Sequence, residues 1–268
     1  NYYKTLFDGH FYGHTYTKIL ENIDKISKSD VEKAYNKIIT EGKKVLSIVG
    51  DMGFEEANAL LNKYLSGIEN TSVKEKNIKT PVLNESKTVE IIKNDVQQSQ
   101  IIQGWIFPTF DSKDYPAIIL LNVILGSAGL SSRLFLELRD KKGLAYTVRS
   151  SYETYQTCAS FSIYIATEPK NIQISLNGFK EEIDKLKKFP VDDIELDFSK
   201  NNVTGKQQFV TETNSQQANL LAYYGIVGLG FDYQEKILGK IKKVTATEIQ
   251  DCANKYFTNN SVVSILKP

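Results

Sequence analysis

An arginine and a tyrosine seven residues apart offer the clearest chemistry in this sequence. Arg139 and Tyr146 lie in the stretch GSAGLSSRLFLELRDKKGLAYTVRS, residues 126–150. A guanidinium is a permanent cation that donates hydrogen bonds in a fixed fork, and a phenol O–H is a further donor. Two such donors, held together, can bind a carbonyl oxygen and stabilise a developing oxyanion. Residue types alone favour a plainer interpretation, in which Arg139 forms a surface ion pair and Tyr146 packs as a strand residue.

The elements around this pair are predicted from the turn residues. Ser131 or Ser132 can cap a helix, because a serine oxygen accepts a bond from a free N–H of the first turn. Gly143 follows two lysines at the position where helices commonly end in a left-handed residue. We expect a helix that ends at about residue 142 and a strand at 144–151. Arg139 and Tyr146 then lie close together on either side of a tight turn.

The two histidines give little support for a metal site. His10 and His14 are the only histidines, and their spacing of four is one that two helical zinc ligands use. However, Gly9 and Gly13 interrupt the segment, so we expect loop histidines. We therefore predict no metal ligands in this chain. A Ser-His-Asp triad is also not expected, because it needs a histidine and these two are the only candidates.

The composition is that of a globular protein. Of the 268 residues, 41% are hydrophobic and 24% charged, and the formal net charge is +1. This balance predicts neither a nucleic acid nor an anionic membrane as partner. No apolar run approaches the roughly 18 residues of a membrane span. The two cysteines, Cys158 and Cys252, cannot form a disulfide framework and suit a reducing compartment without proving one.

Hydrophobic periodicity predicts a mixture of helices and strands. Alternation is clearest at 159–166, where Phe161, Ile163 and Ile165 face one side. The other expected strands lie at about 44–49, 88–93, 100–107 and 262–266. The other expected helices lie at about 18–25, 27–41, 54–65, 115–125, 170–188, 191–211, 214–228, 231–242 and 245–257.

Two distant segments repeat each other. KILENIDKISKSDVEKAYNKII, residues 18–39, matches KILGKIKKVTATEIQDCANKYF, residues 236–257, at a constant offset of 218. Apolar residues align, and so do the helix starts at Ser27 and Thr245, each with an acid three residues later. A chance match of helical patterns is the alternative. We expect two copies of one domain, of which the first is truncated and lacks on the order of 150 residues.

The domain division follows from this repeat. Residues 1–67 are predicted to be the C-terminal part of the first domain, and 87–268 a complete second domain. Residues 68–86 are polar, which predicts a linker between the domains. The alternative is a long surface loop within one domain. We therefore expect the chain to be the C-terminal part of a longer protein.

Three motifs resemble the M16 zinc peptidases, the family of pitrilysin and the mitochondrial processing peptidase. They are LFDGHFYG at 6–13, KKVLSIVGDM at 43–52 and SSRLFLELRDKKGLAYTV at 131–148. The resemblance implies an α+β (α/β sandwich) fold of two homologous domains, each an antiparallel-rich sheet with helices packed on one face. It implies a zinc metalloendopeptidase in which an inverted His-x-x-Glu-His motif of the first domain holds zinc. That motif is absent here, so the fragment alone is expected to be inactive and to hold no zinc.

The same resemblance assigns roles to the opening pair. Active members carry an arginine and a tyrosine at this spacing in the second domain, which implies that Arg139 and Tyr146 are substrate-binding and catalytic. The implied partners are a peptide or unfolded polypeptide substrate and a first M16 domain, in the same polypeptide or a partner subunit, with a dimer expected. The alternatives are a non-catalytic partner or structural core-type subunit without its own zinc site, and a binding module unrelated to proteolysis.

Overall fold

The chain forms two compact units, which are described separately. The computed structural model describes residues 1–68 and 77–268. The first unit comprises Asn1–Thr15, Lys79–Thr204 and Ile237–Pro268, and the second comprises Tyr16–Ile78 and Gly205–Lys236. Part of the predicted linker, residues 69–76, lies outside the described residues. The units do not follow the predicted boundaries at 67 and 87. A division into compact units does not test whether residues 1–67 and 87–268 belong to two homologous domains, so the predicted domain division stays a prediction.

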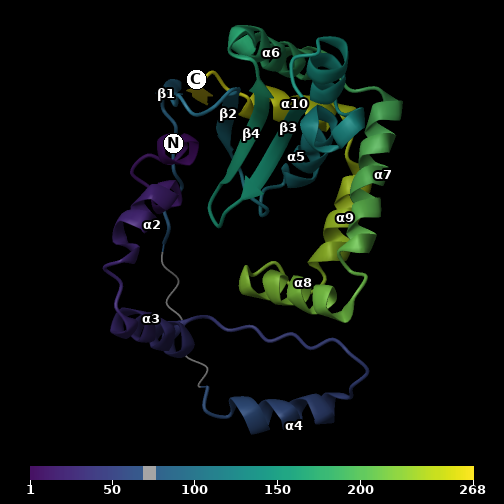
Figure 1. The fold of residues 1–268 in the computed structure, drawn as a ribbon. Helices are drawn as coiled ribbons and strands as arrows, with labels where there is room; N and C mark the ends of the chain where they lie inside the picture. Colours follow the sequence, from purple (N-terminus) through teal and green to yellow (C-terminus); the bar gives the residue numbers. More distant parts are fainter. Residues whose placement is uncertain (69–76) are drawn as a thin grey trace. The chain divides into compact units, whose positions relative to one another are not determined.

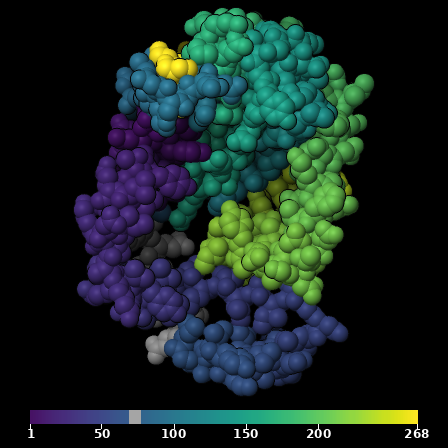
Figure 2. Space-filling model, in the orientation of Figure 1, coloured from purple at the N-terminus to yellow at the C-terminus, as the bar shows by residue number. Residues whose placement is uncertain are grey.

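A mixed five-stranded sheet forms the centre of the first unit, which confirms the α+β prediction. Its strand order is β1-β5-β2-β4-β3. The strands are β1 (Lys87–Ile92), β2 (Ser99–Phe107), β3 (Thr147–Thr154), β4 (Ala159–Thr167) and β5 (Val262–Lys267). Only β1 and β5 run parallel, and the other neighbours are antiparallel. The parallel pair brings the C-terminal end of the chain, yellow in Figure 2, beside the blue β1 segment.

The alternation along β4 determines which face of the sheet carries the core. Phe161, Ile163 and Ile165 are fully buried on one face. Phe107, Phe161 and Phe257 pack there, with ring centroids 4.7–5.2 Å apart. Three helices cover this face: α5 (Tyr115–Asn122), α6 (Ile172–Lys188) and α10 (Ala246–Tyr256). Figure 1 shows α10 and α5 behind the strands, so the predicted helical layer is present.

The N-terminal segment lies on the opposite face, which the sequence did not predict. Tyr2 begins α1 (Tyr2–Leu6), and its hydroxyl forms a 2.9 Å hydrogen bond with the hydroxyl of Ser160. Ser160 precedes Phe161 in β4, so its side chain points away from the helical layer. Burial raises the pKa of the Tyr2 phenol well above its usual value. Helices therefore pack on one face, as predicted, except for the short α1.

Gly104 in β2 provides the space for Tyr2, so its replacement by alanine should displace the N-terminal segment. An added Cβ would lie 1.8 Å from Tyr2 Oη and 2.8 Å from the Phe161 carbonyl oxygen. Overpacking of this kind typically costs about 1–3 kcal/mol. We expect faster proteolysis within residues 1–15, measured by limited proteolysis with mass spectrometry. Gly239→Ala is the matched control, because nothing lies within 4 Å of its Cβ position. Equal cleavage of both variants and the parent would contradict this role of Gly104.

The second unit is helical in its described part. Its helices are α2 (Tyr16–Ile23), α3 (Lys28–Glu41), α4 (Phe54–Leu65) and α8 (Asn214–Ile226). The predicted capping box at the start of α3 is confirmed. The Asp30 N–H donates to Ser27 Oγ at 3.2 Å, and the Ser27 N–H donates to the Asp30 carboxylate at 3.0 Å. The two bonds fix the helix start locally.

The predicted strand at residues 44–49 is wrong for this chain. The segment is extended but forms no ladder with any strand in the described ranges. Val45 packs against Gly225 of α8, whereas Leu46 and Ile48 are exposed. A strand needs a neighbour to accept and donate its backbone hydrogen bonds, and a strand-like sequence does not supply one.

Two further helices contain the boundaries between the units. They are α7 (Asp193–Phe209) and α9 (Tyr233–Lys243). Both were predicted to within a few residues. Among the described residues, no helix is both long enough and apolar enough to cross a bilayer.

Candidate functional site

The helix that carries Arg139 is a π-helix, where the sequence predicted an α-helix. The element η4 spans Phe135–Lys141. The Lys142 N–H donates to the Glu137 carbonyl, five residues back, at 3.2 Å. Leu138 is fully buried and anchors this turn in the core. Single π-turns are rare and occur often at functional sites.

Gly143 reverses the chain after this helix, as predicted. Its φ of +61° is in the left-handed region, which glycine adopts without a steric penalty. The Leu144 N–H then donates to the Leu138 carbonyl at 2.9 Å, and Thr167 Oγ1 donates to the Leu144 carbonyl at 2.6 Å. These bonds hold the chain before β3, which therefore begins at Thr147 and not at residue 144.

The conformation of Gly143, and not its small size, should set its tolerance to substitution. Nothing lies within 4 Å of an added Cβ, so only the positive φ opposes a side chain. The left-handed conformation costs a β-branched residue on the order of 1–2 kcal/mol, whereas asparagine adopts it more readily. Gly143→Val should lower the midpoint of urea unfolding and Gly143→Asn should lower it much less, both followed by Trp105 fluorescence. Equal midpoints for the two variants would contradict the argument.

The structure brings the predicted pair into direct contact. Arg139 Nη1 donates to the Tyr146 carbonyl oxygen at 2.7 Å. The guanidinium carbon of Arg139 also lies 4.5 Å from the centroid of the Tyr146 ring, which is cation–π geometry. The Tyr146 side chain is largely exposed, at 79%. The pair is therefore both assembled and accessible.

Neither residue has the plainer role considered above. In the described ranges, no carboxylate forms an ion pair with Arg139, whereas Arg133 on the same segment donates to Glu195 from Nε and Nη2 at 2.8 and 2.5 Å. Tyr146 precedes β3 and does not pack in the core. The remaining guanidinium N–H groups and the phenol O–H are thus available as hydrogen-bond donors.

The chemistry of this arrangement is recognition of acceptor oxygens. A guanidinium with free donors on one edge binds carbonyl or carboxylate oxygens. A phenol O–H beside a cation can donate to an oxygen on which negative charge develops. Neither group is a nucleophile or general base in this setting, so the pair binds and stabilises an acceptor and needs its reaction partner from elsewhere.

Both histidines lie outside regular helices and strands, as expected for loop residues. His10 Nε2 donates to the Lys79 carbonyl at 3.1 Å, and His10 Nδ1 accepts from the Tyr12 N–H at 3.3 Å. Within residues 1–68 and 77–268, no group of three or more histidine, cysteine, aspartate or glutamate side chains could hold a metal ion. The described residues therefore do not fit a zinc site.

The two cysteines are free and buried. Burial raises the pKa of each thiol to about 12, so both are protonated at neutral pH. A thiol is a weak nucleophile and a poor metal ligand until it loses its proton. Cys158 and Cys252 therefore contribute packing and no evident chemistry.

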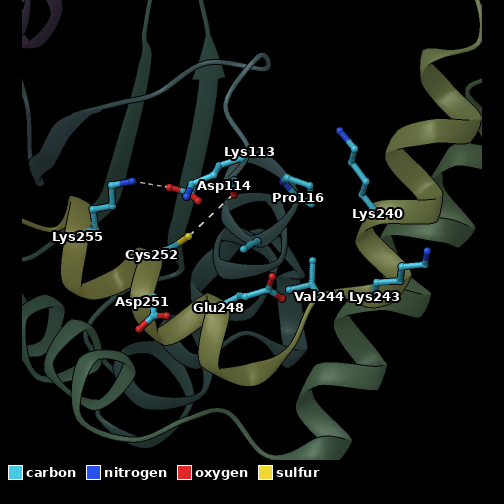
Figure 3. Close-up of a pocket in the computed structure, with 11 residues that line it drawn as sticks. Lys113, Asp114, Pro116, Lys240, Lys243, Val244, Glu248, Asp251, Cys252 and Lys255 are labelled. Atoms are coloured by element: carbon cyan, nitrogen blue, oxygen red, sulfur yellow. Dashed lines mark hydrogen bonds and ion pairs between the residues drawn. The ribbon is translucent and has the colours of Figure 1, made fainter.

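A hollow in the first unit is lined by charged residues that do not converge on one point. It has a volume of about 600 Å³ and lies between α5, α9 and α10. Asp114 accepts hydrogen bonds from Lys255 at 2.7 Å and Tyr256 at 2.6 Å. Burial opposes ionisation of Asp114, but these two donors hold its pKa below the usual value. Lys240 and Lys243 extend in different directions and neither points at Asp114 (Figure 3), so the charges do not converge on one ligand.

A third residue, Phe135, also contacts Arg139, and the sequence did not predict this contact. The Arg139 guanidinium carbon lies 4.5 Å from the centroid of the Phe135 ring. The spacing of four residues along a helix was the available signal, because such side chains share one helix face.

Comparisons with known proteins identify relatives over the whole chain. A family profile described as the peptidase M16 inactive domain matches residues 25–203, more than half of the chain. The zinc protease PqqE of Helicobacter pylori is 28% identical over 283 residues, which cover 100% of this chain and 61% of the relative. The non-peptidase homolog YmxG of the same bacterium is 26% identical over 236 residues, which cover 86% and 53%. The chain thus spans somewhat more than half the length of these relatives.

Solved structures show the same fold. The crystal structure of a protease from Helicobacter pylori has a TM-score of 0.87 and 25% identity, and the match covers 100% of this chain and 65% of that one. A peptidase M16 inactive domain from Pseudomonas fluorescens has a TM-score of 0.84 and 22% identity over 100% of this chain and 64% of that chain.

Proposed function

Because this chain belongs to the M16 peptidase family, we propose that it is the C-terminal portion of a zinc-dependent metallopeptidase. In this proposal it supplies half of the peptide-binding cleft and the Arg139–Tyr146 pair. The observation that carries the proposal is the exposed contact of these two residues, with Arg139 free of any described carboxylate. The zinc protease PqqE supports it as a relative along the whole chain.

The proposed roles follow from the donors of each side chain. Arg139 donates to a backbone carbonyl of the substrate and so fixes the peptide near the scissile bond. The Tyr146 O–H donates to the oxygen that becomes negative in the tetrahedral intermediate, and its stabilisation is greatest when that charge has formed. In this proposal the metal is held by residues outside this chain, which agrees with the lack of a metal-binding cluster among the described residues.

The internal repeat supports a missing partner domain of the same type. Four apolar residues of the second copy are buried, with exposures of 7% or less: Ile237, Ile241, Val244 and Ile249. Their counterparts 218 residues earlier are 52–59% exposed: Ile19, Ile23, Ile26 and Val31. In the second copy α10, which carries Ile249, packs on α5, α6 and β2. We propose that residues 16–49 dock in the same way on a first M16 domain, in the same polypeptide or a partner subunit.

The alternative is a non-catalytic subunit that binds substrate or other subunits. It is favoured by the non-peptidase homolog YmxG, whose match covers 86% of this chain, and by the family description as an inactive domain. The two proposals differ in what the complete protein does, because both use the same fold and the same docking face.

Metal analysis of the purified 268-residue chain tests where the zinc site lies. We expect no stoichiometric zinc after dialysis and no cleavage of unstructured peptides, with or without a chelator. The physical reason is that the described residues hold no cluster of metal-binding side chains. Elemental analysis and a fluorogenic peptide assay provide the measurements. Stoichiometric zinc together with chelator-sensitive cleavage by this chain would overturn the proposal.

A further inference from the structure

We propose that Phe135 is a positioning residue that sets the orientation of Arg139 and, through it, of Tyr146. The inference rests on the proposed function for its catalytic consequence, but its structural part stands on the contacts alone. The Arg139 guanidinium carbon lies 4.5 Å from the ring centroids of both Phe135 and Tyr146.

Arg139 has few other contacts that could hold it. The one hydrogen bond of its side chain in the described ranges is from Nη1 to the Tyr146 carbonyl oxygen, at 2.7 Å. An arginine side chain has many rotamers, and their loss opposes any fixed geometry. Two aromatic rings and one carbonyl therefore define where its remaining donors point.

Of the two rings, only Phe135 is tied to the core. It is half-buried on η4, between the fully buried Leu134 and Leu138. The Tyr146 side chain is largely exposed. Phe135 therefore holds Arg139, and Arg139 in turn holds Tyr146. Loss of the Phe135 contact should make both the Arg139 guanidinium and the Tyr146 side chain more mobile.

The attraction depends on the aromatic ring and not only on its bulk. A ring face carries negative charge density that attracts a guanidinium, and a branched aliphatic side chain of similar volume does not. Phe135→Leu should therefore release Arg139 while it keeps most of the packing on η4. Phe135→Trp should retain or strengthen the attraction.

The first arm of the test observes Arg139 directly, without any catalytic assay. In NMR spectra of the 268-residue chain, the Arg139 side chain should give cross-peaks to the Tyr146 ring, because the guanidinium carbon lies 4.5 Å from its centroid. We expect these cross-peaks to weaken in Phe135→Leu and to persist in Phe135→Trp. Leu136→Ala is the matched control, because Leu136 is exposed on the same helix. Unchanged Arg139–Tyr146 cross-peaks in Phe135→Leu would overturn the proposal whatever the complete protein does.

The second arm uses peptide cleavage by the complete protein. Exposed cation–π contacts correspond to about a two- to five-fold change in an equilibrium or rate. Phe135→Leu should lower kcat by about that factor, with rescue by Phe135→Trp. In an Arg139→Ala background the same change should have no further effect, because the contact is already lost. If Phe135→Leu lowered kcat by the same factor in the parent and in the Arg139→Ala variant, the role of Phe135 would be merely structural. A protein that cleaves no peptide would refute the proposed function and leave the NMR result to decide on Phe135.

Discussion

Replacing Tyr146 by phenylalanine should lower kcat for peptide cleavage by the complete protein by a factor of about 10²–10³. The change removes one O–H donor and keeps the ring on which Arg139 lies, 4.5 Å from the guanidinium carbon. The lost interaction is made with the charged intermediate and not with the uncharged substrate, so KM should change little. Initial rates over a range of peptide concentrations provide both constants.

Stability should be unaffected by this substitution, because Tyr146 is largely exposed. Tyr164→Phe on β4 is the matched control, since it removes a phenol O–H from a ring that contacts Arg149 and not Arg139. It should leave kcat unchanged. A Tyr146→Phe enzyme as active as the parent would show that the phenol does not stabilise the intermediate.

The largest effect on stability should come from Phe161→Ala, at about 3–5 kcal/mol. Phe161 is fully buried and contacts the rings of Phe107 and Phe257 at 4.7 and 5.1 Å. Its removal leaves a cavity between the sheet and its helices, which the surrounding side chains fill only in part. Urea unfolding followed by the fluorescence of Trp105, the only tryptophan, measures the loss in this unit.

Ile163→Val in the same strand is the graded control, because it deletes one methylene from an equally buried position. It should cost about 0.5–1.5 kcal/mol. A Phe161→Ala variant no less stable than Ile163→Val would contradict the position of Phe161 at the centre of the core.

Local signals in the sequence predicted much of the fold. The alternation of Phe161, Ile163 and Ile165 identified the buried face of β4, since neighbours in a strand point to opposite sides. Thr245 and Glu248 identified the start of α10, where the Glu248 N–H donates to Thr245 Oγ1 and the Thr245 N–H donates to the Glu248 carboxylate. Such features depend on a few consecutive residues, so one sequence is sufficient to find them.

Features that depend on distant residues were not predicted. The docking of α1 on the open face of the sheet requires Tyr2 to meet Gly104 and Ser160, and no local pattern encodes that contact. Residues 44–49 have the composition of a strand, but a strand forms only where another strand pairs with it. The π-helical turns around Arg139 also went unpredicted, because their residues suit an α-helix equally well.

The sequence predicted that the two residues of the candidate site lie close together. The left-handed turn at Gly143 was enough to predict that Arg139 and Tyr146 meet, and their contact is confirmed. Their catalytic and substrate-binding roles stay a prediction. The contribution of Phe135 needed the structure, since many helices carry residues at that spacing without a contact between them.

Peptide cleavage by the complete, zinc-loaded protein carrying both Arg139→Ala and Tyr146→Phe decides whether the pair takes part in catalysis. If the pair forms half of an active site whose metal lies elsewhere, kcat/KM should fall by a factor of at least about 10² while the zinc content stays that of the parent. Cleavage at the parental rate by the double variant would show that Arg139 and Tyr146 take no part in catalysis.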